Sequence, residues 1–169
     1  MLLHRKILTT LTAVVAALGG FSSQAIAGST TGNAQAVIVN PITIAESQAM
    51  NFGSIGPAAA ASTVVLSTAG AVSSAAADLV PGTGAAAGVF SVSGEAGYTY
   101  AITLPVSATL TSGANTMTVD TWTTATGSGT ATLDGTGADT VNVGATLNVG
   151  AGQAAGTYTG TYTITVDYN

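Results

Sequence analysis

Residues 157–168, TYTGTYTITVDY, alternate between two kinds of side chain along their whole length. Threonine or aspartate occupies every odd-numbered position, and tyrosine, glycine, isoleucine or valine occupies every even-numbered one. Successive side chains of a β-strand point to opposite faces, so this pattern predicts an antiparallel strand with one buried face and one solvated face.

The same period of two recurs elsewhere in the chain. It is clear in residues 140–149 (TVNVGATLNV) and 98–104 (YTYAITL), where Pro105 then interrupts the ladder. Shorter candidates are residues 63–67, 89–93 and 117–122. Glycine-rich segments separate these runs, and short strands joined by glycine turns predict an all-β antiparallel sandwich.

The composition supports strands over disorder. Charged residues make up 5% of the 169 residues and hydrophobic residues 47%, whereas disordered chains combine low hydrophobicity with high charge. We therefore expect one β-domain whose solvent face carries threonine, serine and asparagine in place of charge.

The first 27 residues have the features of a secretory leader. His4, Arg5 and Lys6 form a short basic start, and residues 7–20 are apolar. Ala25 and Ala27 then provide the small-x-small pattern of a signal peptidase site, which predicts cleavage after Ala27 and export. This interpretation divides the chain into a leader (1–27), an N-terminal extension (28–45) and a sandwich domain (46–169).

Removal of the leader would leave seven acidic side chains and no Lys, Arg, His or Cys, a formal side-chain charge of −7. Such a chain lacks a histidine base, a cysteine nucleophile, a Schiff-base lysine and thiolate or imidazole metal ligands. It also lacks the basic surface that binding to nucleic acid requires. The sequence thus predicts a protein that is not an enzyme and has no cofactor.

Two pairs of carboxylates are candidate sites. Glu95 and Asp120 could serve as the acid and base of a glycoside hydrolase, but nothing in the sequence places them together. Asp134 and Asp139 flank a glycine loop that could offer oxygen ligands to calcium, but the loop lacks the EF-hand spacing. We expect no metal site and interpret that loop as a solvated turn.

The N-terminal extension contains an apolar run after a polar start. One face would carry Ala34, Ala36, Ile38, Ile42 and Ile44, with Asn40 interrupting the series. The pattern fits either the first strand of the chain's own sandwich or a donor strand, which adds to the sheet of a neighbouring subunit.

The order of motifs resembles that of a secreted proteobacterial domain family of unknown function. The motifs are Phe52-Gly53-x-Ile55, Gly97-Tyr98-x-Tyr100 with Leu104-Pro105, Val143-Gly144-Ala145-Thr146-Leu147-x-Val149, Gln153, Gly156-x-Tyr158-x-Gly160-x-Tyr162 and Val166-x-Tyr168-Asn169. The same order of landmarks is similar to the spore coat protein U domain, the subunit of archaic chaperone–usher pili. Those subunits usually carry cysteines after the donor segment, and this chain has none.

The pilin resemblance implies an incomplete immunoglobulin-like sandwich, which a neighbour's N-terminal donor strand completes. It places the donor strand at Ala34, Ala36, Ile38, Ile42 and Ile44, and the acceptor groove at Tyr162, Ile164, Val166 and Tyr168. It further implies a periplasmic chaperone, an outer-membrane usher and an extracellular filament of head-to-tail copies as partners and destination.

Two functions are therefore expected, of which the first is favoured. One is a structural fimbrial subunit that polymerises by donor-strand exchange. The alternative is a monomeric secreted or surface-attached adhesive domain, in which the N-terminal strand pairs within its own chain.

Overall fold

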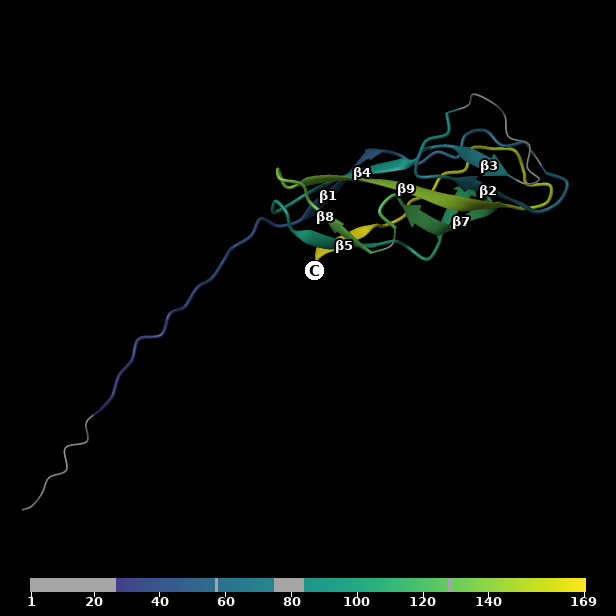
Figure 1. Ribbon diagram of the computed structural model, residues 1–169. Helices are drawn as coiled ribbons and strands as arrows, with labels where there is room; N and C mark the ends of the chain where they lie inside the picture. Colours follow the sequence, from purple (N-terminus) through teal and green to yellow (C-terminus); the bar gives the residue numbers. More distant parts are fainter. Residues whose placement is uncertain (1–26, 57, 75–83, 128) are drawn as a thin grey trace, which may run out of the picture. The chain divides into compact units, whose positions relative to one another are not determined.

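The computed structural model describes residues 27–56, 58–74, 84–127 and 129–169 (Figure 1). The chain divides into two units, Met1–Ala36 and Val37–Asn169. In the first unit, residues 27–36 are exposed and have no regular secondary structure. The predicted leader up to residue 26, with Ala25, lies outside the described residues, and Ala27 is the first of them.

The second unit is built from antiparallel strands. They are β1 (Thr43–Gln48), β2 (Ser62–Leu66), β3 (Val72–Ser74), β4 (Gly88–Ser93), β5 (Thr99–Thr103), β6 (Ala108–Ser112), β7 (Asn115–Thr124), β8 (Thr130–Thr132), β9 (Ala138–Val149) and β10 (Thr165–Tyr168). Among the described residues there is no helix, and so none long and apolar enough to cross a membrane.

The larger sheet is organised around β9, the longest strand. Asn148 pairs with Thr63 of β2 and with Thr118 of β7, so these two strands lie on opposite edges of β9. By the same reasoning β4 shares the β2 edge, because Val143 pairs with Gly88 of β4 and with β7. β1 extends the sheet beyond β4, β3 beyond β2 and β6 beyond β7.

A glycine allows β2 and β4 to follow one another along the same edge. A Cβ at Gly144 would collide with the carbonyl oxygen of Leu66, where β2 ends. Close approach of two backbones is a usual reason for glycine within a strand. The hairpin between β6 and β7 uses a second glycine, Gly113, with a φ of 61° at the first central position of a two-residue turn.

The smaller sheet has the order β10-β5-β8. In Figure 1, β5 and the C-terminal strand lie below β4 and β9, so that two layers face one another at this end of the unit. The predicted antiparallel β-sandwich is therefore confirmed.

The inner face of β9 contributes to two hydrophobic clusters. Its first half supplies Val141 and Val143 to a core that both sheets enclose, together with β4, β5, β8 and β10. Its second half supplies Ala145, Leu147 and Val149 to a cluster with β2 and β7, where no strand of the smaller sheet lies opposite. Among the described residues, the smaller sheet thus covers the first half of β9, and residues 50–55 pack over the second half.

Most of the predicted strands are present, with one difference of consequence. Residues 140–149, 98–104, 89–93, 117–122 and 63–67 correspond to β9, β5, β4, β7 and β2. The single strand predicted over residues 157–168 is divided, because regular pairing is confined to Thr165–Tyr168.

Candidate functional site

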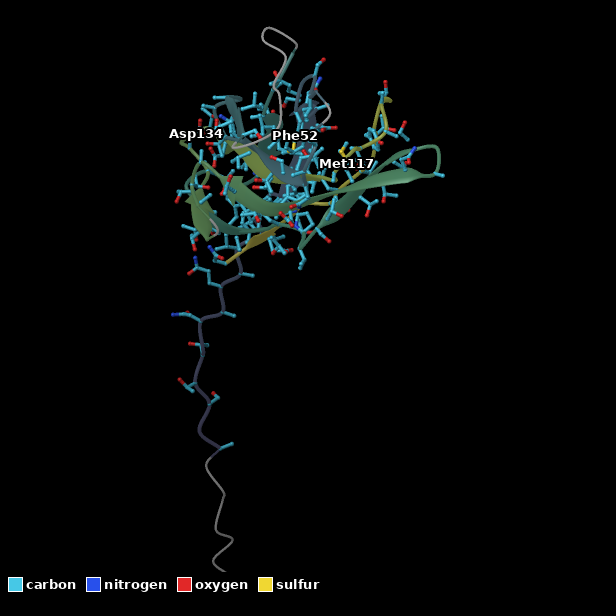
Figure 2. All side chains as sticks on the ribbon, turned by 90° about the vertical axis from the view of Figure 1, so that its right-hand side faces the viewer. Phe52, Met117 and Asp134 are labelled. Carbon is cyan, nitrogen blue, oxygen red and sulfur yellow. The ribbon has the colours of Figure 1, made fainter. Side chains whose placement is uncertain are left out.

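An apolar groove lies over the second half of β9. It has a volume of about 750 Å³. Its walls come from residues 50–56, from the inner faces of β6, β7 and β9, and from residues 153–160 with Tyr162. In the view of Figure 2, Phe52 lies near the middle of the unit, with Met117 to one side of it and Asp134 to the other.

The floor of the groove belongs to the second hydrophobic cluster. Phe52, Val119, Leu147 and Val149 are all buried there. The half-buried side chains Ile55, Leu110 and Met117 pack against this floor. No charged residue is among those that line the groove in the described part of the chain. The described lining of the groove is therefore uncharged, with an apolar floor and some polar side chains at its walls.

The C-terminal segment forms one wall of the groove, and part of its backbone makes no hydrogen bond to other described backbone groups. Thr159 exchanges two backbone hydrogen bonds with Thr111 of β6, at N–O distances of 2.8 and 3.0 Å. Between this bridge and β10, residues 160–163 make no backbone pairing with any described residue. Unpaired backbone beside an apolar groove is the arrangement that an added strand can use.

The rim beyond Thr159 is held by an uncharged network. Gln153 Nε2 donates to Tyr158 Oη at 2.7 Å and to the Thr116 carbonyl at 3.3 Å. Tyr158 Oη donates in turn to the carbonyl of Ala154 at 2.8 Å. These bonds fix the loop that closes the outer end of the groove.

Two aromatic rings form the inner end. A bulge between Asp120 and Thr123 adds one residue to β7, and Thr121 has a φ of 48° there. The extra residue shifts the alternation of the strand, so Trp122 follows Val119 on the inner side. The ring of Trp122 lies 4.6 Å, centroid to centroid, from that of Tyr162.

Both rings carry a buried polar atom. Trp122 Nε1 and Tyr162 Oη have no hydrogen-bond partner among the described residues. Burial raises the pKa of Tyr162 to about 12, and the nearby charge of Glu46 contributes in the same direction. A buried hydroxyl without a hydrogen-bond partner lowers the stability of the fold. The buried polar atoms at this end of the groove therefore lack the hydrogen bond that Tyr100 makes in the enclosed core.

The predicted donor face is divided by the structure. Ile42 and Ile44 pack against the chain's own enclosed core, and Ile44 of β1 pairs with Val92 of β4. Ala34 and Ala36 are exposed, and Ile38 is 97% exposed. The exposed part of the predicted donor face therefore precedes Asn40, and the part after Asn40 packs partly buried within the chain.

The predicted acceptor residues are divided in the same way. Tyr162 lines the groove and also packs against the enclosed core, where its ring meets that of Phe90 edge-on. Val166 is buried in the enclosed core, and Ile164 and Tyr168 pack against it. Sequence analysis did not place Phe52, Leu110 or Met117 in the groove. Phe52 belongs to the Phe52-Gly53-x-Ile55 motif, which marked it as notable, but nothing in the sequence shows which residues pack against it.

A cluster of polar contacts holds the point where the extension meets the sandwich. The backbone N and the Nδ2 of Asn40 both donate to Glu95 Oε2, at 2.9 and 2.8 Å. Tyr168 Oη donates to the Asn40 carbonyl at 2.9 Å and accepts from the backbone N of Glu95 at 2.6 Å. We call these contacts among Asn40, Glu95 and Tyr168 the clasp.

The structure does not bring Glu95 and Asp120 together. Glu95 belongs to the clasp, beyond the end of β9 at which Ser93 pairs with Ala138. Asp120 pairs with Thr146, eight residues further along β9, about 26 Å at the rise of a strand.

The carboxylates of the glycine loop have partners within the chain. Asp134 Oδ1 accepts from the backbone N and Oγ1 of Thr136 and from the backbone N of Ala138, and these bonds lower its pKa. Asp139 accepts from Tyr100 Oη at 2.6 Å. In the described ranges, no three His, Cys, Asp or Glu side chains gather in a way that could hold a metal ion.

Residues 42–168 match the family DUF4402, described as a domain of unknown function. No curated protein and no solved structure matches the chain.

Proposed function

The chain belongs to the DUF4402 family, and we propose that it is a structural subunit of an extracellular fimbria that polymerises head to tail by donor-strand exchange. The observation that carries the proposal is the open groove over the second half of β9, beside residues 160–163 with their unpaired backbone. A strand inserted there would gain main-chain hydrogen bonds from one wall and apolar contacts from the floor.

The proposed occupant is the N-terminal arm, residues 28–39, of a second copy. Val37 and Ile38 of this arm are 71% and 97% exposed, although both are large apolar residues. An extended segment of twelve residues spans about 40 Å, enough to run the length of such a groove. Exposed apolar side chains on one copy and an apolar groove on the next are complementary.

The two ends of the contact lie far apart on each copy, which favours a filament. The arm starts at the clasp, near Ala138, whereas the groove extends to Val149 at the other end of β9. β9 also has twelve residues and is about 40 Å long. A head-to-tail contact between opposite ends does not close on itself and so generates an open chain of subunits.

The rest of the proposal concerns export. A leader of residues 1–27 would direct the chain to the periplasm, where a chaperone would cover the groove before an usher joins one subunit to the next. The resemblance to spore coat protein U subunits supports these partners, and the surface filament is the destination.

The first test is deletion of residues 28–38. This deletion retains Asn40 and β1, which belong to the folded unit, so the monomer is expected to keep its stability within about 0.5 kcal/mol. Electron microscopy of the cell surface and unboiled denaturing gels should show loss of filaments and of the oligomer ladder. Undiminished filaments from the deletion variant would rule out this mode of assembly.

A matched pair of substitutions sharpens the test. Ile38→Asp should abolish polymers, because it would place a charge in an apolar groove. Val106→Asp is the control, since Val106 is 92% exposed in the loop between β5 and β6, and it should leave polymers unchanged. Equal effects of the two substitutions would mean that the arm has no special role.

The alternative, a monomeric secreted binding domain, is favoured by the pairing of β1 with β4 in the same chain. It predicts a monodisperse monomer whose size does not depend on concentration or on the arm. Analytical ultracentrifugation of the full chain without its leader, compared with the deletion variant, distinguishes the two functions.

A further inference from the structure

We propose that the clasp directs the arm to a second copy by preventing it from folding back into its own groove. This inference rests on the proposed function and adds a control over which groove the arm enters. It starts from the contacts of Asn40. Both backbone polar groups of this residue and its side-chain amide are held by Glu95 and Tyr168, far along the chain.

The direction of the arm at its root is set by β1. Thr43 pairs with Ser93, and the strand runs from there toward Gln48 and the groove. Asn40 continues the same line one step beyond, against Glu95. Followed back from Thr43, the chain therefore leads toward the clasp end of the sandwich, and a return to its own groove requires a reversal.

The sequence contains a favourable place for that reversal, and the clasp occupies it. Asn40 is followed by Pro41, and Asn-Pro is a dipeptide that commonly starts a turn. A turn at Asn40 would release all twelve residues of the arm to run back along the chain's own C-terminal segment. The hydrogen bonds to Asn40 hold it against Glu95 and Tyr168 instead.

With the clasp closed, the arm is too short to fill its own groove. A reversal before Asn40 uses about four residues and leaves about eight, which span about 26 Å. The distance from Tyr168 back to Gly156 at the outer rim is twelve residues, about 40 Å in an extended chain. A second copy meets no such limit, because its whole arm can enter from outside.

The chemistry of the clasp suits a stable anchor. The acceptor for both Asn40 donors is a carboxylate oxygen, and hydrogen bonds to charged groups are stronger than neutral ones. The ring of Tyr168 also packs edge-on against Tyr98, with centroids 5.7 Å apart, which fixes the hydroxyl. Loss of either partner should therefore free the root of the arm while the sandwich remains folded.

The test uses the cysteine-free sequence to measure where the arm lies. Met117→Cys in the groove is combined with Ala34→Cys, Ala36→Cys or Ile38→Cys in the arm, in full chains that carry the leader. After mild oxidation at the cell surface, a disulfide between copies gives a ladder on a non-reducing gel. A disulfide within one copy gives a faster-migrating monomer.

With the clasp intact, we expect the ladder and little intrachain product. Glu95→Ala should raise the ratio of intrachain to interchain disulfide about tenfold, the scale of one lost charge-assisted hydrogen bond. Glu95→Gln keeps an acceptor and should give a smaller increase. Asn115→Ala is the control, because it changes an exposed asparagine of the β6–β7 hairpin outside the arm, the clasp and the groove.

Tyr168→Phe provides a second clasp variant that keeps the packed ring if Glu95→Ala fails to fold. A ratio that stays at the value of the intact clasp in both variants, with the ladder present, would overturn the clasp inference and leave the proposed function standing. No interchain disulfide at any of the three arm positions with the clasp intact would overturn both.

Discussion

The two halves of the C-terminal segment have the same alternating sequence and different surroundings. Thr165–Tyr168 pairs with β5 residue by residue, from Thr103 to Tyr100, and closes the enclosed core. Residues 157–163 make one bridge to β6 and otherwise border the groove. The alternating sequence therefore determines which side chains face inward. Whether the backbone also forms strand hydrogen bonds depends on which other segments of the chain lie beside it.

The largest expected difference between the halves is in the cost of a buried charge. Val166 is 8% exposed in the enclosed core, so Val166→Asp should destabilise the domain by about 4 kcal/mol or more. Thr161→Asp, on the exposed face of the unpaired half, should change stability by less than about 0.5 kcal/mol. Urea denaturation followed by tryptophan fluorescence measures both, and similar losses would mean that the halves are equally packed.

The next largest effect tests how the unpaired half is held against β6. A Cβ at Gly160 would collide with the carbonyl oxygen of Thr109 and crowd Leu110. Gly160→Ala should therefore cost about 1–3 kcal/mol, because a strand would have to shift. Gly135→Ala is the matched control, since a Cβ there meets nothing within 4 Å and should have almost no effect. A neutral Gly160→Ala would show that this half does not dock on β6.

Sequence analysis could predict the faces of the strands because burial imposes a period of two on neighbouring residues. The even positions of residues 157–168 are half-buried or buried except Gly160, and the odd positions are all exposed. It also predicted the antiparallel sandwich, whose ladders depend on the same pattern. The strands β3, β6 and β8 were not predicted. β3 and β8 have three residues each, too few to show a period, and β6 has Leu110 as its only large apolar residue.

The candidate site was less predictable, because it depends on contacts between distant residues. The donor at Asn40 and the acceptor at Glu95 are 55 residues apart, and neither has a local pattern that points to the other. The assignment of Ile42 and Ile44 to a donor strand followed one face of an apolar run without a break at Asn40. In the structure these two residues are partly buried and pack against the chain's own core, since β1 pairs with β4.

A smaller difference in stability is expected between variants of two tyrosines, Tyr100 in the enclosed core and Tyr162 at the groove. Tyr100 Oη donates to Asp139 within the enclosed core, so Tyr100→Phe should cost about 1–2 kcal/mol at neutral pH. Tyr162 Oη has no partner in the described part of the chain, so Tyr162→Phe should be neutral or slightly stabilising. Urea midpoints of the two variants decide this, and a large loss from Tyr162→Phe would reveal a bond that this hydroxyl makes.

The Tyr162 hydroxyl should also make the free energy of unfolding depend on pH in the alkaline range, because it is buried at the inner end of the groove. Burial raises the pKa of Tyr162 from 10.0 to about 12, so the unfolded chain loses this proton first. The stabilising contribution is therefore complete below about pH 10 and is lost as the pH rises toward about 12. Urea midpoints between about pH 9 and pH 12 should fall for the wild type and fall less for Tyr162→Phe, with the remaining decline due to Tyr100, whose pKa is also raised. Equal slopes for the two proteins would mean that Tyr162 titrates as an exposed tyrosine and that the inner end of the groove is open to water.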